Sequence, residues 1–183
     1  MSAAAEAGFL ALLAPDLRPA FGAVPGLETR IAAWVALPEA SLVPPEVLMA
    51  AVGERLGPED AADPAAALES FQIPDLALAL ACGRGIPRAL EELERRFGGE
   101  MDRAIAKSKS LGISRDEFRQ IIREKLFVAA PGAAPRITSY SGRAPLVGWL
   151  RVVCARAVID LSRRADDGVP SGDQGLLDRL PSR

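Results

Sequence analysis

Prolines and glycines divide this alanine- and leucine-rich chain into short segments. The 183 residues include 15 prolines and 16 glycines, and a proline inside a helix removes a backbone donor and clashes with the preceding turn. Aromatic residues make up only 5% of the chain, and runs of the β-branched and aromatic residues that favour strands are few. The sequence therefore predicts an all-α protein of short helices joined by proline- and glycine-containing turns.

The residue types on which many enzymes and metal sites depend are scarce. The chain has no histidine, which removes the commonest general base and the commonest metal ligand. Its two cysteines, Cys82 and Cys154, stand alone in apolar helical patterns, as is typical of buried reduced thiols. No phosphate-binding loop of the Walker type is present. We therefore expect no catalytic residue, metal, cofactor or small-molecule substrate.

The bulk charge and the N-terminus bear on location and partners. The formal net charge of −2 and the pI of about 5.3 argue against a protein that coats nucleic acid indiscriminately, yet they permit one basic face. The start, Met-Ser-Ala-Ala-Ala-Glu, is acidic where a secretory signal is basic. No apolar run approaches the roughly 20 residues that span a bilayer. These features predict a cytoplasmic protein without membrane contact.

Residues 1–60 are predicted to form a short helical N-terminal extension of unknown role. Alanine-rich segments cut by prolines predict helices at Ala3–Leu13, Leu27–Leu37 and Pro45–Leu56. The acidic stretch Pro58–Ala67 that follows is either a linker or a short capped helix.

Residues 74–164 are predicted to form a compact bundle of three to four helices. Pro74–Cys82 is a short apolar helix, and Pro87 opens a longer one that reaches Lys109, with Gly98-Gly99 interrupting or kinking it. Ser114 begins the next helix as a capping box with Glu117.

The helix after Ser114 has two faces at helical spacing. Its predicted buried stripe consists of Phe118, Ile121, Ile122 and Leu126. A second, mixed face comprises Gln120, Arg123, Glu124 and Phe127. This second face is either simply solvated or a partner surface, and Phe127 slightly favours a partner.

The segment 136–164 combines a polar loop with a basic helix. It contains six arginines and one aspartate, a local charge of +5 in a chain of net charge −2. Pro145 is predicted as the first helical residue. Leu150, Val153, Ala157 and Leu161 form an apolar stripe, and the arginines lie off it. The concentration of positive charge indicates a local anion-binding surface.

The run from Asp75 to Arg164 resembles the polymerase-binding and promoter-melting domain of bacterial sigma factors of the sigma-70 family, in its compact extracytoplasmic-function-like form. Three pieces carry the resemblance in the family's order. Pro87–Lys109 is similar to the first conserved helix, and Asp116–Phe127 is similar to the helix that docks on the polymerase clamp. Ile137–Arg164, the most specific piece, resembles the specificity loop and the recognition helix.

The resemblance implies a protein that binds core RNA polymerase, opens minus-ten promoter DNA and holds flipped bases of the non-template strand. A polar loop that contains glycine lets the backbone approach flipped bases closely and hold them, and arginines along the helix neutralise the DNA phosphates. An anti-sigma protein is a further expected partner. Polymerase contacts are implied at Asp116, Glu117, Gln120, Arg123, Glu124 and Phe127. DNA contacts are implied at Tyr140, Ser141, Gly142, Arg143, Trp149, Arg151, Arg156, Arg163 and Arg164.

Two of these positions have a simpler interpretation that stays open. Trp149 is either an aromatic at the duplex fork or a core tryptophan beside Leu150. Arg156 either meets DNA or pairs with Asp160 four residues on.

The chain also departs from the family pattern. Val152 and Ala155 occupy the positions at which housekeeping sigma factors place polar residues that read the minus-ten element. No helix-turn-helix for the minus-thirty-five element follows Arg164; residues 165–183 are polar and rich in breakers and predict a flexible tail. The chain is therefore a piece of a longer factor, or it works without that half. The alternatives are a helical adaptor or decoy on RNA polymerase and a structural bundle without a polymerase link.

Overall fold

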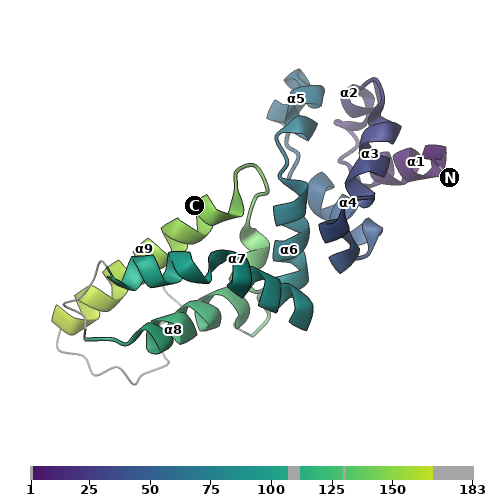
Figure 1. Cartoon of the computed structure of the whole chain (residues 1–183). Helices are drawn as coiled ribbons and strands as arrows, with labels where there is room; N and C mark the ends of the chain where they lie inside the picture. Colours follow the sequence, from purple (N-terminus) through teal and green to yellow (C-terminus); the bar gives the residue numbers. More distant parts are fainter. Residues whose placement is uncertain (1, 107–111, 130, 167–183) are drawn as a thin grey trace.

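The computed structural model describes residues 2–106, 112–129 and 131–166, and within these ranges the protein is all-α. The first half contains five α-helices and two 3-10 turns: α1 (Ser2–Leu12), α2 (Arg18–Gly22), α3 (Leu27–Val35), η1 (Pro38–Leu42), α4 (Pro45–Gly53), η2 (Pro58–Ala62) and α5 (Pro64–Glu69). The second half contains α6 (Ile73–Gly83), α7 (Pro87–Ala106), α8 (Arg115–Phe127), η4 (Arg136–Ser139) and α9 (Leu146–Asp166) (Figure 1).

Prolines start several of these helices. Pro45, Pro64 and Pro87 are the first residues of α4, α5 and α7, and Pro74 is the second residue of α6. A proline fits there because the first N–H groups of a helix have no partner within it. The stretch predicted as a linker or a capped short helix is η2 followed by α5, and the Asp63 carboxylate caps α5 by accepting from the Ala66 N–H at 3.0 Å.

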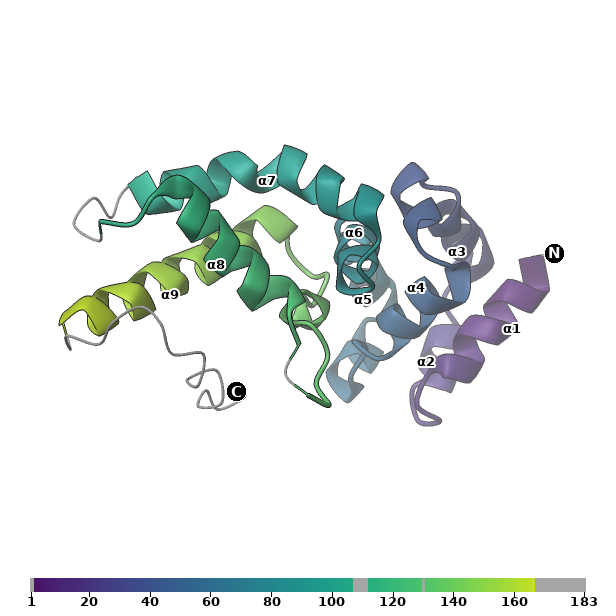
Figure 2. The same cartoon turned by 90° about the horizontal axis from the view of Figure 1, so that it is seen from below.

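Helix α6 lies between two groups of helices. In Figure 1, α1–α4 gather on one side of α6, α5 lies beyond its upper end, and α7–α9 extend on the other side; Figure 2 shows the same division of α1–α4 from α7–α9 from below. We call residues 2–70 the N-terminal unit and α6–α9 the C-terminal bundle. Leu76, Ala77 and Leu78 of α6 are fully buried because neighbours cover this helix from both sides. One continuous apolar core runs from Phe9 in α1 to Ala157 in α9.

The C-terminal bundle agrees with the expected helices apart from one-residue differences at helix ends and one feature of α7. Leu150, Val153 and Ala157 are buried, and Leu161 packs against the same core. Helix α9 begins at Leu146, one residue after the predicted Pro145. Of the two alternatives predicted at Gly98-Gly99, an interruption or a kink, the interruption is wrong: α7 runs through both glycines, with Phe97 and Met101 on either side buried in the core.

The ends of two predictions fall outside the described residues. Helix α7 is described to Ala106, and residues 107–109 of the predicted helix lie outside the described ranges. Helix α9 includes Ala165 and Asp166, and the rest of the predicted tail, residues 167–183, also lies outside them. Among the described helices, none combines the length and the apolar character needed to cross a membrane.

We expect both cysteines to resist alkylation in the folded protein. Cys82 and Cys154 are each 1% exposed, and burial raises the pKa of the Cys82 thiol to about 12 and that of the Cys154 thiol to about 11. The reactive thiolate is therefore scarce at pH 8. Mass spectrometry after iodoacetamide treatment should find both thiols unmodified in buffer and alkylated in urea. Rapid labelling of either thiol in buffer would contradict the packing described here.

Candidate functional site

The N-terminal end of α8 is closed by the predicted capping box. The Glu117 N–H donates to the Ser114 hydroxyl at 3.2 Å, and the Ser114 N–H donates to the Glu117 carboxylate at 2.8 Å. These hydrogen bonds to Ser114 lower the pKa of Glu117. Glu117 therefore serves the helix itself, while Asp116 in the same turn is exposed.

The remaining polymerase-side candidates share the outer face of α8. Gln120, Arg123 and Glu124 are exposed, and Phe127 is half-buried. The Gln120 amide donates to the Glu124 carboxylate at 2.9 Å. Arg123 reaches across to α7, where its Nη2 lies 3.2 Å from Glu94 Oε2. The structure thus places Arg123 and Phe127 beside α7.

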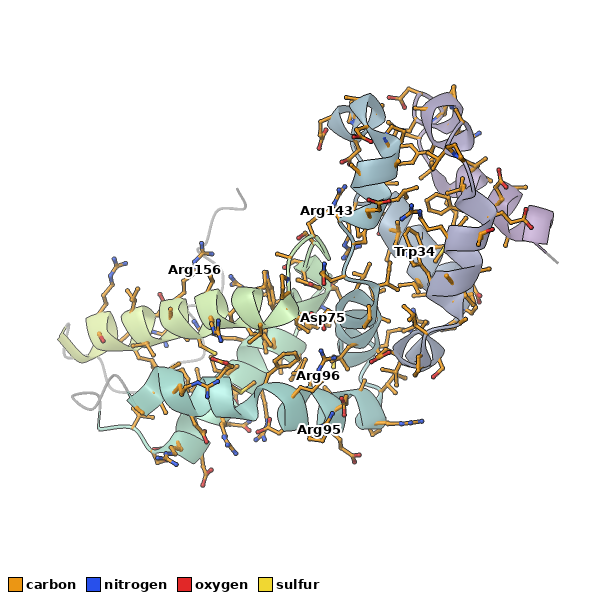
Figure 3. All side chains as sticks on the ribbon, turned by 45° about the horizontal axis from the view of Figure 1, so that its top comes forward. Trp34, Asp75, Arg95, Arg96, Arg143 and Arg156 are labelled. Carbon is orange, nitrogen blue, oxygen red and sulfur yellow. The ribbon has the colours of Figure 1, made fainter. Side chains whose placement is uncertain are left out.

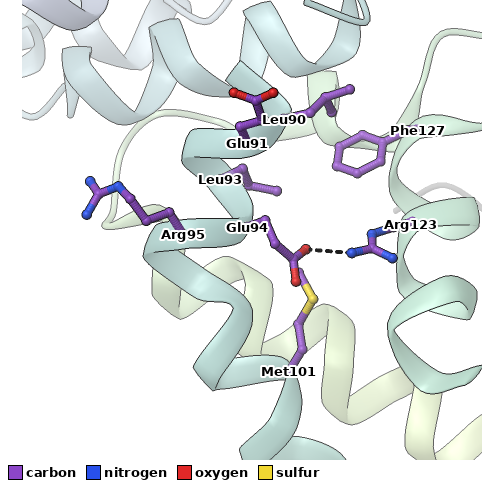
Figure 4. A pocket seen from close by; sticks show the side chains of 8 residues that line it. All are labelled: Leu90, Glu91, Leu93, Glu94, Arg95, Met101, Arg123 and Phe127. Atoms are coloured by element: carbon purple, nitrogen blue, oxygen red, sulfur yellow. Dashed lines mark ion pairs between the residues drawn. The ribbon is translucent and has the colours of Figure 1, made fainter. Parts of the chain in front are cut away.

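A groove of about 560 Å³ lies between α7 and α8 at this face. Figure 4 shows Leu90 and Phe127 facing each other across it and Arg123 paired with Glu94. Its floor is mainly apolar, and its rim is charged. The lining residues are Leu90, Glu91, Leu93, Glu94, Arg95, Met101, Arg123 and Phe127. Of these lining residues, only Arg123 and Phe127 of α8 were predicted from the sequence to belong to a partner surface. The leucines of α7 match the pattern of an ordinary buried helix face.

Tyr140, expected in the strand-contacting loop, is a core residue. Its side chain is 1% exposed, and its hydroxyl donates to the Ala144 carbonyl. Burial, with the nearby charge of Asp75, raises the pKa of the hydroxyl. The Trp149 ring packs edge-on against it with centroids 6.0 Å apart. Trp149 is itself half-buried against the core, so the geometry favours the core interpretation of Trp149, with Tyr140 buried beside it.

Gly142 packs against the start of α6 and the residues just before it, and Arg143 reaches the N-terminal unit rather than solvent. Gly142 has a φ of +76°, and an added Cβ would lie 3.2 Å from the Phe71 ring. Its carbonyl accepts from the Gln72 N–H at 2.7 Å. The Arg143 guanidinium lies 4.4 Å above that ring and donates to Asp60 at 2.6 Å. Of the expected loop residues, only Ser141 is exposed.

The outer side of α9 carries the exposed arginines. Arg151 makes a two-point ion pair with Glu100 at 2.9 and 3.0 Å, which together with Arg103 holds the pKa of Glu100 at about 2. Arg156, Arg163 and Arg164 are exposed and form no ion pair with any residue whose side chain the structure describes. Figure 3 shows Arg156 directed away from the bundle.

The expected alternative pairing of Arg156 with Asp160 is wrong. The Asp160 carboxylate instead accepts from Lys125 of α8 at 2.7 Å. The neighbouring helix supplies the closer cation, so Arg156 is left at the surface.

Sequence reasoning missed the role of Asp75, which is the one buried charged residue among those described, at 9% exposure. Its carboxylate accepts from Arg96 Nη2 of α7 at 2.8 Å and from the Leu146 N–H at the start of α9 at 2.8 Å. Figure 3 places Asp75 and Arg96 together between the helices. The sequence held one signal for this role, an acidic residue within the apolar segment Pro74–Cys82. The position of Asp75 in the first turn of a helix, however, is also explained by helix capping.

Within the described ranges, no three acidic or cysteine side chains converge so as to hold a metal ion. Comparisons with protein-family models, with curated proteins and with solved structures found no match to this chain. The surface itself offers two chemistries: exposed positive charge on α9, and a mixed polar and apolar face on α7 and α8.

Proposed function

We propose that this chain is a cytoplasmic sigma-factor-like protein of transcription initiation. It binds core RNA polymerase through α8 and contacts the non-template strand of minus-ten promoter DNA through α9, without covalent chemistry. The observation that carries the proposal is the set of exposed arginines on α9, in the segment whose sequence resembles the family's recognition helix: Arg156, Arg163 and Arg164.

The outer side of α9 suits a nucleic-acid strand. Arg156 and Arg163 are seven residues apart, two helical turns, and so lie on one face about 10 Å apart along the helix. Val152 and Ile159 occupy the same side and are each 50% exposed. Guanidinium groups neutralise phosphates, and exposed apolar side chains contact thymine methyl groups. This combination favours a surface that binds the backbone and touches bases.

The α8 face suits a protein partner. An apolar floor with a charged rim is the usual anatomy of a protein interface, and the groove between Leu90 and Phe127 has both. Gln120 and Glu124 extend the polar part of this surface along α8. In the proposed function this face meets the polymerase clamp, so the two partners use different helices of one bundle.

Removing two α9 arginines tests the DNA half of the proposal. The Arg156→Ala, Arg163→Ala double variant is expected to bind a fluorescent single-stranded oligonucleotide about tenfold more weakly, with a salt slope smaller by about 1.4 for two lost phosphate contacts. Fluorescence anisotropy in the presence of core polymerase, across a salt series, measures both quantities.

The matched control is Arg84→Ala, Arg88→Ala, which removes the same charge from exposed sites after α6 and at the start of α7, outside the groove. Equal weakening by both double variants would mean that only overall charge matters, and would contradict a strand site on α9.

A polymerase adaptor or decoy is the second candidate, and one observation favours it. Tyr140 and Arg143, which the resemblance assigns to the strand, both bind within the protein. An adaptor is expected to capture core polymerase just as the proposed sigma-like protein does. Its affinity for the DNA strand, however, would not depend on Arg156 or Arg163.

A further inference from the structure

The loop 136–145 is held by an arginine from the N-terminal unit. Arg55 follows α4, and its guanidinium points at the loop from more than 80 residues earlier in the chain. Nε donates to the Tyr140 carbonyl at 3.0 Å, and Nη2 donates to the Thr138 carbonyl at 2.6 Å. The remaining Nη1 donates to the Ala51 carbonyl of α4 at 2.8 Å. One side chain therefore joins the end of α4 to two carbonyls of the loop.

Arg143 makes the reciprocal contact from the loop to the N-terminal unit. Its Nη2 donates to the Arg55 carbonyl at 3.0 Å and to Asp60 at 2.6 Å, and its Nη1 donates to the Ser70 hydroxyl at 2.9 Å. Phe71 supports the guanidinium from below at 4.4 Å. Arg55 thus binds carbonyls of the loop that carries Arg143, and Arg143 binds the carbonyl of Arg55. We call these two sets of contacts the clamp between the N-terminal unit and the loop.

The two parts carry opposite charge, which favours this contact. Residues 1–70 contain ten acidic side chains and three arginines, whereas residues 71–166 contain 17 basic and 11 acidic side chains. Long-range attraction of this kind brings surfaces together without fixing a geometry. The geometry comes from Arg55 and Arg143, because planar guanidinium groups bind oxygen acceptors in a defined orientation.

The loop depends on these arginine hydrogen bonds because it contains very little regular secondary structure. η4 is a single 3-10 turn, so no continuing helix supplies N–H donors to the Thr138 and Tyr140 carbonyls. Arg55 supplies both donors. With these carbonyls held, the outer edge of the loop presents Ser139, Ser141 and Ala144 to solvent directly before α9.

We infer that Arg55 is a positioning residue that fixes this outer edge of the loop for contact with the nucleic-acid strand. The inference rests on the proposed function and assigns a role to the N-terminal unit, which the family resemblance leaves without one. A loop fixed before binding loses less conformational entropy when the strand arrives. Loss of the clamp should therefore weaken strand binding and leave polymerase capture intact.

The test compares Arg55→Ala and Arg55→Lys with Arg18→Ala. Lysine keeps the charge and the aliphatic stem but lacks the fork that spans two carbonyls. Arg18 is the matched control, since its guanidinium also donates to two backbone carbonyls, those of Leu13 and Ala11, entirely within the N-terminal unit. Arg55→Lys keeps the test decisive if Arg55→Ala fails to fold.

Two readouts are taken on each variant. Hydrogen exchange measures the loop directly, at the N–H groups of Thr138 and Tyr140 and at the Gln72 N–H that donates to Gly142. Anisotropy with core polymerase and a fluorescent single strand measures binding. Both Arg55 variants should exchange faster at these three sites and bind the strand about tenfold more weakly. Arg18→Ala should change neither readout, and exchange within α8 should stay at the parent rate in all three.

Each other outcome overturns the inference in a distinguishable way. Unchanged exchange in both Arg55 variants would show that Arg55 does not hold the loop, whatever the chain binds. Faster exchange with unchanged strand affinity would show that the loop edge is not a contact surface. Tighter strand binding would show that the N-terminal unit blocks the loop. A parent chain that binds no strand contradicts the proposed function, and the inference falls with it.

Discussion

Replacing Asp75 with alanine is expected to lower the free energy of unfolding by about 3 kcal/mol, because removing one partner of a buried ion pair leaves the charge of the other uncompensated. The estimate takes the lower end of the usual range since the Arg96 side chain is 29% exposed. Asp75 also accepts the Leu146 N–H at the first turn of α9, so the substitution removes the cap of that helix. Urea denaturation followed by circular dichroism measures the change.

Two further variants separate the contributions of charge and hydrogen bonding at Asp75. Asp75→Asn keeps an acceptor for the Leu146 N–H and is expected to cost about half as much as alanine. Glu92→Ala removes the partner of Arg95 in an exposed pair on α7 and should change the stability by less than about 1 kcal/mol. If Asp75→Ala were as mild as Glu92→Ala, Asp75 would not join the three helices.

Replacing Tyr140 with alanine is expected to cost about 4 kcal/mol, the usual loss when a large buried aromatic side chain is truncated. Tyr140 is among the largest fully buried side chains, and its ring supports Trp149. The same urea titration measures this loss. A shift in the fluorescence of Trp149, recorded in a Trp34→Phe background, should accompany it.

Tyr140→Phe is the informative companion variant. It removes only the hydroxyl that donates to Ala144 and should cost about 1 kcal/mol. Because the ring stays in the core, strand affinity should equal that of the parent chain. A large loss of strand affinity in a stable Tyr140→Phe protein would instead restore the direct DNA contact that the resemblance implied.

The helices and the α8 cap could be predicted because their signals are local. Proline at a first turn, apolar residues at helical spacing and the Ser114–Glu117 capping box all depend on neighbours within a few residues. The same logic fails where the partner is distant. Tyr140 and Arg143 were expected in an open loop, and their actual partners include Arg55, 85 and 88 residues away in the chain.

The sequence also left open which of two partners a charged residue takes. Asp160 has Arg156 at a favourable helical spacing, but Lys125 on the adjacent helix binds it instead. Asp75 is the opposite case: an acidic residue in an apolar helix is visible in the sequence, but its two partners, Arg96 and the Leu146 N–H, appear only when α6, α7 and α9 pack together.

Capture of core RNA polymerase by the immobilised chain tests the central claim most directly. The parent should retain polymerase, and the Gln120→Ala, Arg123→Ala variant should lose it, because both side chains are exposed on α8 and Arg123 lines the groove. The control variant Gln72→Ala, Arg84→Ala changes the same two residue types at exposed positions away from α8 and should capture as well as the parent. No capture by the parent chain, or equal capture by the α8 variant, would contradict the proposed polymerase surface.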